Sequence, residues 1–201
     1  MARFSPQHLE EFIDIVAAEI GEKNLPVVLE KAGLPTNWVE HESIRNMDAQ
    51  SAAEGYAGIQ QAIRIYYGRG ARGILHRIGS NYWKNLIQNA SFRERAQAKL
   101  LRTLPKIKRR KSALELIPLL LDMDTEAIKV HTLDLNLLLV DQLSPSTHNQ
   151  SCETPICHVT YGLIREALYW ATAEDALIEE IACKASGAKN CEFKITFGET
   201  L

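Results

Sequence analysis

Long apolar runs are missing from the 201 residues, so we expect no segment that targets the protein to a membrane or to the cell exterior. No window approaches the roughly 18 consecutive apolar residues that a spanning helix needs. The first residues, Met1 to Ser5, contain no apolar signal-peptide core. Four cysteines without such a signal fit a reducing compartment better than a disulfide framework. We therefore expect a soluble, cytoplasmic protein with no transmembrane segment.

Excess charge of either sign is also missing, because the formal net charge is only −2. This balance gives no reason to expect nucleic acid as a partner. With 46% hydrophobic and 24% charged residues, the composition is that of a globular protein, and we expect one domain over residues 1–201. The densest charge run is Lys106–Lys111, which we interpret as a solvated linker. Alternatively, it docks an acidic partner or makes a peripheral contact with an anionic membrane.

The spacing of apolar residues predicts helices first and strands afterwards, which indicates an α+β fold. The helical region, residues 1–123, is expected to pack on a small antiparallel sheet in residues 124–201, with one helix inserted between the strands. A capping-box pattern at Ser51-Ala-Ala-Glu54 is expected to start the third helix. Helices are expected over residues 6–20, 25–32, 51–66, 71–87, 91–101, 112–121 and 155–171, and strands over 127–133, 135–143, 176–185 and 191–197.

Three cysteines and one glutamate near the end of the chain form a possible metal-ligand set. Thr154-Pro155 is expected to begin a helix with Cys157 in its first turn, where the helix dipole favours the thiolate. Cys183 and Cys191 flank a turn at Gly187, so two antiparallel strands would bring both sulfurs to one side. Side chains alternate along a flat strand, so joint ligation by Glu180 requires a bulge or a site at the strand end. Three thiols and a carboxylate suit tetrahedral zinc.

These residues also resemble a known family signature. The C-terminal quarter of the chain is similar to the 4-vinyl reductase domain in Cys157 and the pattern Glu180-x-x-Cys183-x-x-x-Gly187-x-x-x-Cys191-x-Phe193. The resemblance implies a zinc site made of Cys157, Glu180, Cys183 and Cys191. Four protein ligands leave no open position, so the zinc is expected to be structural. Cys152 is a rival ligand that would replace Glu180 in an all-cysteine set.

Relatives of this family suggest what the domain binds. The resemblance implies a hydrophobic small molecule between helices and sheet, most readily a tetrapyrrole or chlorophyll precursor, in a carrier, sensor or assembly accessory of pigment metabolism and photosynthesis. It also implies a homodimer. His76 is a candidate axial ligand of a tetrapyrrole metal. The candidate pocket residues lie on two consecutive helices, where an ordinary helix–helix core is the alternative: Tyr56, Ile63, Tyr66, Tyr67, His76, Tyr82 and Trp83.

Two other classes of function stay open. The family name implies a vinyl reductase of chlorophyll biosynthesis, but such an enzyme needs a source of hydride or electrons. Residues 68–73 match G-x-G-x-x-G, yet a helical pattern precedes them where a nucleotide-binding fold requires a strand. The other alternative is a dimeric interaction module. The phenol-sensing relatives hold the ligand hydroxyl with a histidine and a tryptophan, but residues 133–151 contain no tryptophan, which argues against phenol sensing. The related haem–nitric-oxide sensors carry a Tyr-x-Ser-x-Arg motif, which is missing from this sequence. We also expect no complete transcription activator, because the sequence shows no ATPase or DNA-binding domain.

Overall fold

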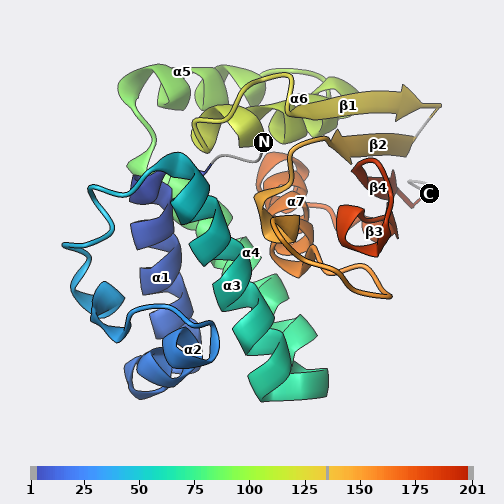
Figure 1. The fold of residues 1–201 in the computed structure, drawn as a ribbon. Coiled ribbons are helices and arrows are strands. Elements are labelled where there is room, and N and C mark those ends of the chain that lie inside the picture. The colour runs from blue at the N-terminus through green and yellow to red at the C-terminus, as the bar shows by residue number, and fades with distance from the viewer. Residues whose placement is uncertain (1–3, 135, 199–201) are drawn as a thin grey trace.

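The computed structural model describes residues 4–134 and 136–198 and confirms the α+β class. Helices precede the sheet in the chain, and one helix lies between the second and third strands (Figure 1). The elements are α1 (Pro6–Ile20), α2 (Leu25–Lys31), α3 (Ala49–Tyr67), α4 (Ala71–Asn89), α5 (Phe92–Leu101), α6 (Lys106–Leu120), β1 (Ile128–Leu133), β2 (Asn136–Asp141), α7 (His158–Thr172), β3 (Leu177–Ala182) and β4 (Cys191–Thr196). Leu135, expected to begin the second strand, lies outside the described residues.

The four strands form one antiparallel sheet in the order β1-β2-β4-β3. In β4, Cys191, Phe193 and Ile195 are buried while the residues between them are more exposed, as the period-two pattern of a half-buried strand predicts. Leu139 of β2 lies opposite Phe193, so both strands direct apolar side chains into the same core. The hairpin formed by β3 and β4 is thereby fixed against the rest of the molecule.

Helix α7 lies centrally and contacts α4, α6 and β3 (Figure 1). Its approach to α4 is close because a glycine stands on each side. A Cβ atom added to Gly79 would lie 2.1 Å from the carbonyl oxygen of Val159, and one added to Gly162 would lie 2.1 Å from that of His76. The two backbones therefore touch directly, and this contact sets the position of the start of α7.

Three expected helix starts are wrong, those of α3, α6 and α7. Helix α3 begins at Ala49, because the carboxylate of Asp48 accepts hydrogen bonds from the backbone N–H groups of Gln50 and Ser51. Helix α7 begins at His158, three residues after the proline expected at its first position, and Cys157 is its N-cap residue. The proline does not start the helix, because residues 155–157 are not helical and Cys157 has a ψ of 48°.

The basic run Lys106–Lys111 is not a linker. It forms the first turns of α6, which follows Pro105 directly. Lys106 and Arg110 both pair with Glu174, beyond the end of α7, and so tie α6 to that helix. Within the described part of the chain, no helix is long and apolar enough to cross a membrane.

Candidate metal centre

Four segments bring Cys157, Glu180, Cys183 and Cys191 together. Cys157 caps α7, Glu180 lies in β3, Cys183 follows the end of β3, and Cys191 is the first residue of β4. The ladder between β3 and β4 shifts register between Glu180 and Ala182. This irregularity, together with the position of Cys183 beyond the strand end, turns both side chains toward one point. In a flat strand Glu180 and Cys183 would point to opposite faces, and the irregularity removes this obstacle to a shared site.

The distances in this cluster fit a tetrahedral metal ion. The Cys157 sulfur lies 3.9 Å from the Cys183 sulfur and 3.5 Å from the Cys191 sulfur. A Zn–S length of 2.3 Å with tetrahedral angles places neighbouring sulfurs about 3.8 Å apart. One ligand atom from each of the four residues, including a carboxylate oxygen of Glu180, lies within 4.8 Å of every other. The three thiols are buried, so water does not compete at the sulfur atoms.

The two carboxylate oxygens of Glu180 have different surroundings. Oε2 accepts a hydrogen bond from the backbone N–H of Cys157 at 3.0 Å. Oε1 is buried and has no hydrogen-bond partner among the described residues. Burial raises the pKa of Glu180 to about 8. An unpartnered carboxylate oxygen beside three thiols is the donor that a cation would satisfy, so the residues present fit a bound zinc ion.

Burial and contacts among the three thiols also shift their pKa values. Hydrogen bonds to the sulfurs of Cys183 and Cys191, together with burial, raise the pKa of Cys157. The pKa of Cys183 is lowered, because the Cys157 and Cys191 thiols donate to its sulfur. The Cys183 interaction and burial raise the pKa of Cys191 to about 12, although its contact with Cys157 acts in the opposite direction.

Neighbouring polar groups support the sulfurs. The backbone N–H of Lys184 donates to the Cys191 sulfur at 3.4 Å, and the Ser144 hydroxyl lies 3.7 Å from the Cys157 sulfur. Gly187 takes a φ of 92° in the connecting turn, as its spacing predicts. Cys152 is outside the four-residue group and is partly exposed. The sequence did not point to Ser144 or Lys184, which reach the sulfurs only through the fold.

The seven aromatic and apolar residues expected to line a pocket occupy several environments. Tyr56, Ile63, Tyr82 and Trp83 are buried in the core, and the Tyr82 hydroxyl donates to the carbonyl of His8 at 3.2 Å. Tyr66 is exposed and packs edge-on against Tyr67 near the end of α3. His76 stacks on Tyr161 at 4.0 Å between ring centres. Their shared role as a pocket stays a prediction.

His76 lines a cleft of about 470 Å³ beside the cluster. Burial and nearby His158 lower the pKa of His76 to about 4, so its ring is neutral at pH 7. Glu180 also lines this cleft and so connects it with the candidate metal-ligand set. The other lining residues come from α4, from α7 with its preceding loop, and from β3: Arg72, Thr154, Pro155, His158, Tyr161, Ile178 and Glu179.

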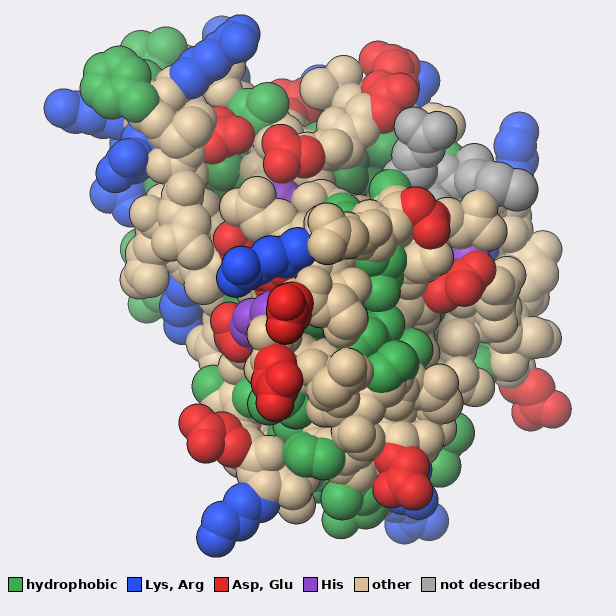
Figure 2. All heavy atoms as spheres, turned by 60° about the vertical axis from the view of Figure 1, so that its left-hand side comes forward, with side chains coloured by type: hydrophobic (Ala, Val, Ile, Leu, Met, Phe, Trp, Pro, Cys, Tyr) green, Lys and Arg blue, Asp and Glu red, His purple; other side chains and the backbone are tan. Residues whose placement is uncertain are grey.

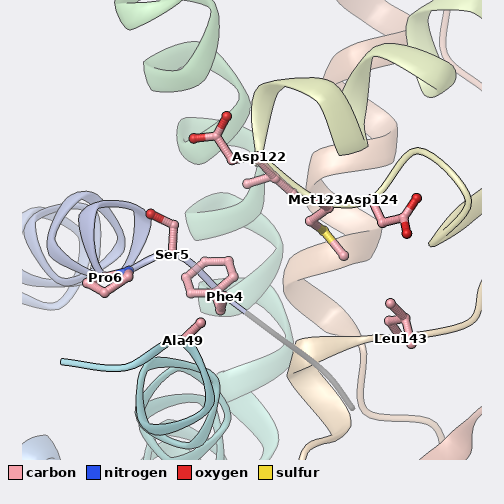
Figure 3. A pocket seen from close by; sticks show the side chains of 9 residues that line it. Phe4, Ser5, Pro6, Ala49, Asp122, Met123, Asp124 and Leu143 are labelled. Atoms are coloured by element: carbon pink, nitrogen blue, oxygen red, sulfur yellow. The ribbon is translucent and has the colours of Figure 1, made fainter.

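A larger cavity of about 830 Å³ opens between the helical part and the sheet part (Figure 3). Phe4, Met123 and Leu143 contribute apolar surface, while Asp122 and Asp124 place carboxylates on the segment after α6. The remaining lining residues are Ser5, Pro6, Ala49 and Leu121. These segments are distant in the chain and carry no shared motif, so this cavity could not be expected from the sequence.

Comparison with known proteins supports the family resemblance. Residues 144–197 match the family model of the 4-vinyl reductase domain, and this segment contains all four residues of the cluster. The match confirms the similarity seen in the signature from Cys157 to Phe193. Among proteins with curated descriptions, none matches the chain.

Solved structures show the fold. An unliganded Fe(II) H-NOX protein from K. algicida is similar over 100% of this chain and 98% of its own, with a TM-score of 0.61 and 15% identity. An H-NOX protein from S. oneidensis in the Fe(II)NO ligation state is similar over 94% and 97%, with a TM-score of 0.56 and 15% identity. The phenol-responsive sensory domain of the transcription activator PoxR, with phenol, aligns over 69% and 71%, with a TM-score of 0.48 and 12% identity. The fold is therefore H-NOX-like.

Proposed function

We propose that this chain is a ligand-binding sensor or carrier domain whose C-terminal part is held together by a structural zinc ion. The observation that carries the zinc assignment is the convergence of Cys157, Glu180, Cys183 and Cys191, with ligand atoms within 4.8 Å of one another. The family match over residues 144–197 and the H-NOX-like fold support the ligand-binding role. Zinc would supply a closed four-ligand junction and no open position for chemistry.

The role of this junction follows from the elements it would join. Cys157 belongs to the start of α7, while the other three ligands belong to the β3–β4 hairpin. A metal ion bound by both would add its binding free energy to folding, because the unfolded chain has no preformed site. The cleft beside Glu180 and the orientation of α7 would then depend on the occupied site.

For the ligand, we propose the cavity of Figure 3 as the binding site. Its volume of about 830 Å³ lies in the range of small-molecule sites, which is about 300–1,000 Å³. Phe4 and Leu143 would pack against an apolar body, while Asp124 favours hydrogen-bond donors over anionic groups. The Asp122 carboxylate lies 3.4 Å from Nε2 of His8. A tetrapyrrole or chlorophyll precursor is our candidate ligand, with its carboxylates directed to solvent.

Metal analysis with two matched cysteine variants tests the zinc assignment. Wild-type protein is expected to contain one zinc per chain. Cys183→Ser removes a buried member of the cluster, so it should lose zinc and melt at a lower temperature. Cys152→Ser removes a thiol outside the cluster and should retain both properties. If Cys183→Ser kept the full zinc content and the wild-type melting temperature, the proposed zinc site would be wrong.

Titration with porphyrins, followed by absorbance, tests the ligand proposal. Leu143→Trp should weaken binding, because the larger side chain would occupy part of the cavity. Ile65→Trp should leave binding unchanged, because Ile65 lies on the exposed surface of α3. NADPH-dependent loss of a vinyl group with this protein alone would establish the reductase instead. Protein that binds no tetrapyrrole but forms a stable homodimer in native mass spectrometry would favour the interaction module.

A further inference from the structure

Helix α5 presents an unusually apolar outer face. The side chains of Phe92 and Leu100 are 86% and 67% exposed, and Ala96 between them is also exposed. Residues spaced by four lie on one side of a helix, so these three form a continuous stripe. The opposite face contributes Ala98 and Leu101 to the protein interior. The stripe therefore has no partner within the described chain.

Basic side chains flank this stripe. Arg93, Arg95 and Lys99 of α5 are exposed, and the ion pairs of the described residues do not include them. The acidic residue of this helix, Glu94, accepts a hydrogen bond from the backbone N–H of Ser91 in a capping box. Figure 2 shows hydrophobic side chains that protrude together with Lys and Arg side chains at the upper left, at the height of α5 in Figure 1.

The charge of the surrounding segment is far from that of the whole chain. Residues 91–111 contain nine Lys and Arg and one Glu, an excess of eight positive charges. Because the whole chain carries −2, the remaining residues carry −10. Part of the excess is neutralised, since Lys106 and Arg110 pair with Glu174 and Lys111 pairs with Glu115. Of the six cations left in this segment, Arg93, Arg95 and Lys99 lie on α5 and Arg102 follows it directly, beside the exposed stripe.

We propose that α5 docks on an anionic lipid surface, with Phe92 and Leu100 inserted among the headgroups and the flanking cations bound to lipid phosphates. Exposed aromatic and leucine side chains with Lys or Arg beside them are the groups by which a helix binds the interface of an anionic membrane. A second copy of this chain is a poor partner for the face. Isologous contact places each face against its own copy, so the same cations would meet across it.

Vesicle sedimentation with the full zinc-loaded chain tests this assignment. The chain should bind phosphatidylcholine vesicles containing 30% phosphatidylserine, should bind pure phosphatidylcholine much less, and should be released by added salt. Phe92→Ser combined with Arg95→Gln should reduce the partition coefficient on the order of 50-fold, from about tenfold for the ring and about fivefold for the charge. Because both side chains are exposed, the melting temperature should not change.

The matched control is Ile65→Ser combined with Arg69→Gln. These residues are also an exposed apolar side chain and an exposed cation, but they lie near the end of α3 and in the turn that follows it. This variant should bind vesicles like the wild type. Equal loss in both variants, or no preference for anionic vesicles, would overturn the proposal. A dimer in solution that Phe92→Ser dissociates would assign the face to a second copy and would also overturn it. If the first variant melts early, Leu100→Ser with Lys99→Gln replaces it.

Discussion

Adding one methyl group at the crossing of α4 and α7 should both destabilise the fold and weaken metal binding. In Gly79→Ala the new Cβ would lie 2.1 Å from the carbonyl oxygen of Val159. A carbon and an oxygen in ordinary contact are about 3.3 Å apart, so the helices would have to separate by about 1.2 Å. The obstacle is backbone, so no side-chain rotation relieves it.

The magnitude follows from two opposing terms. Forcing an extra methyl group into a packed contact costs about 3 kcal/mol when backbone has to move. Alanine is favoured over glycine within a helix by about 1 kcal/mol, which offsets part of that cost. The net loss of about 2 kcal/mol corresponds to a fall in melting temperature of about 4–8 °C for a chain of this size. Since α7 carries Cys157 at its start, its displacement should also lower zinc affinity.

The assay is thermal unfolding by circular dichroism, paired with a chelator competition for zinc. Gly73→Ala is the control, because it lies on the same helix and its nearest neighbour would be the flexible end of Arg77 at 3.6 Å. That variant should melt at or above the wild-type temperature. Wild-type melting of Gly79→Ala would show that the helices do not touch at this position. Reduced stability with unchanged zinc affinity would show that the crossing does not position Cys157.

Two pH effects follow from the titratable groups. His76 has a folded pKa of about 4, below its ordinary 6.5, so the unfolded chain takes up its proton first as pH falls. The neutral ring contributes about 1–2 kcal/mol to the free energy of unfolding, a value reduced for its partial exposure. This contribution is present above pH 6.5 and is lost toward pH 4. His76→Gln should therefore flatten the dependence of the free energy of unfolding on pH in this range, as measured by urea unfolding. Zinc must displace protons from Cys157 and Cys191, whose pKa values are raised, that of Cys191 to about 12, and below pH 8 also from Glu180, whose pKa is raised to about 8. Affinity in chelator competition should therefore rise with pH, by about 100-fold per unit where two protons leave, and a flat profile would contradict this ligand set.

The sequence predicted those features correctly that depend on residues close together in the chain, such as helix bounds and turns. The period of apolar residues placed α1, α4 and α5 within about two residues of their observed ends. The turn at Gly187 was predictable because a φ of 92° favours glycine. The spacing from Cys157 to Cys191 indicated the ligand set, since a hairpin brings its two ends together. In contrast, the true caps of α3 and α7 were missed because stronger-looking signals lay close by.

The sequence by itself determined the order of helices and strands, the C-terminal hairpin and the residue types of the candidate metal-ligand set. Only the tertiary structure decided how those ligands meet, because the register shift beside Glu180 depends on pairing with β4. It also decided the contact of Gly79 with Gly162 and the cavity between Phe4 and Leu143. The glycine contact and the cavity bring together residues more than 80 positions apart in the chain. The register shift depends on how one strand pairs with another. Periodicity within a short window reports which face of an element is apolar, but not which distant element will cover it.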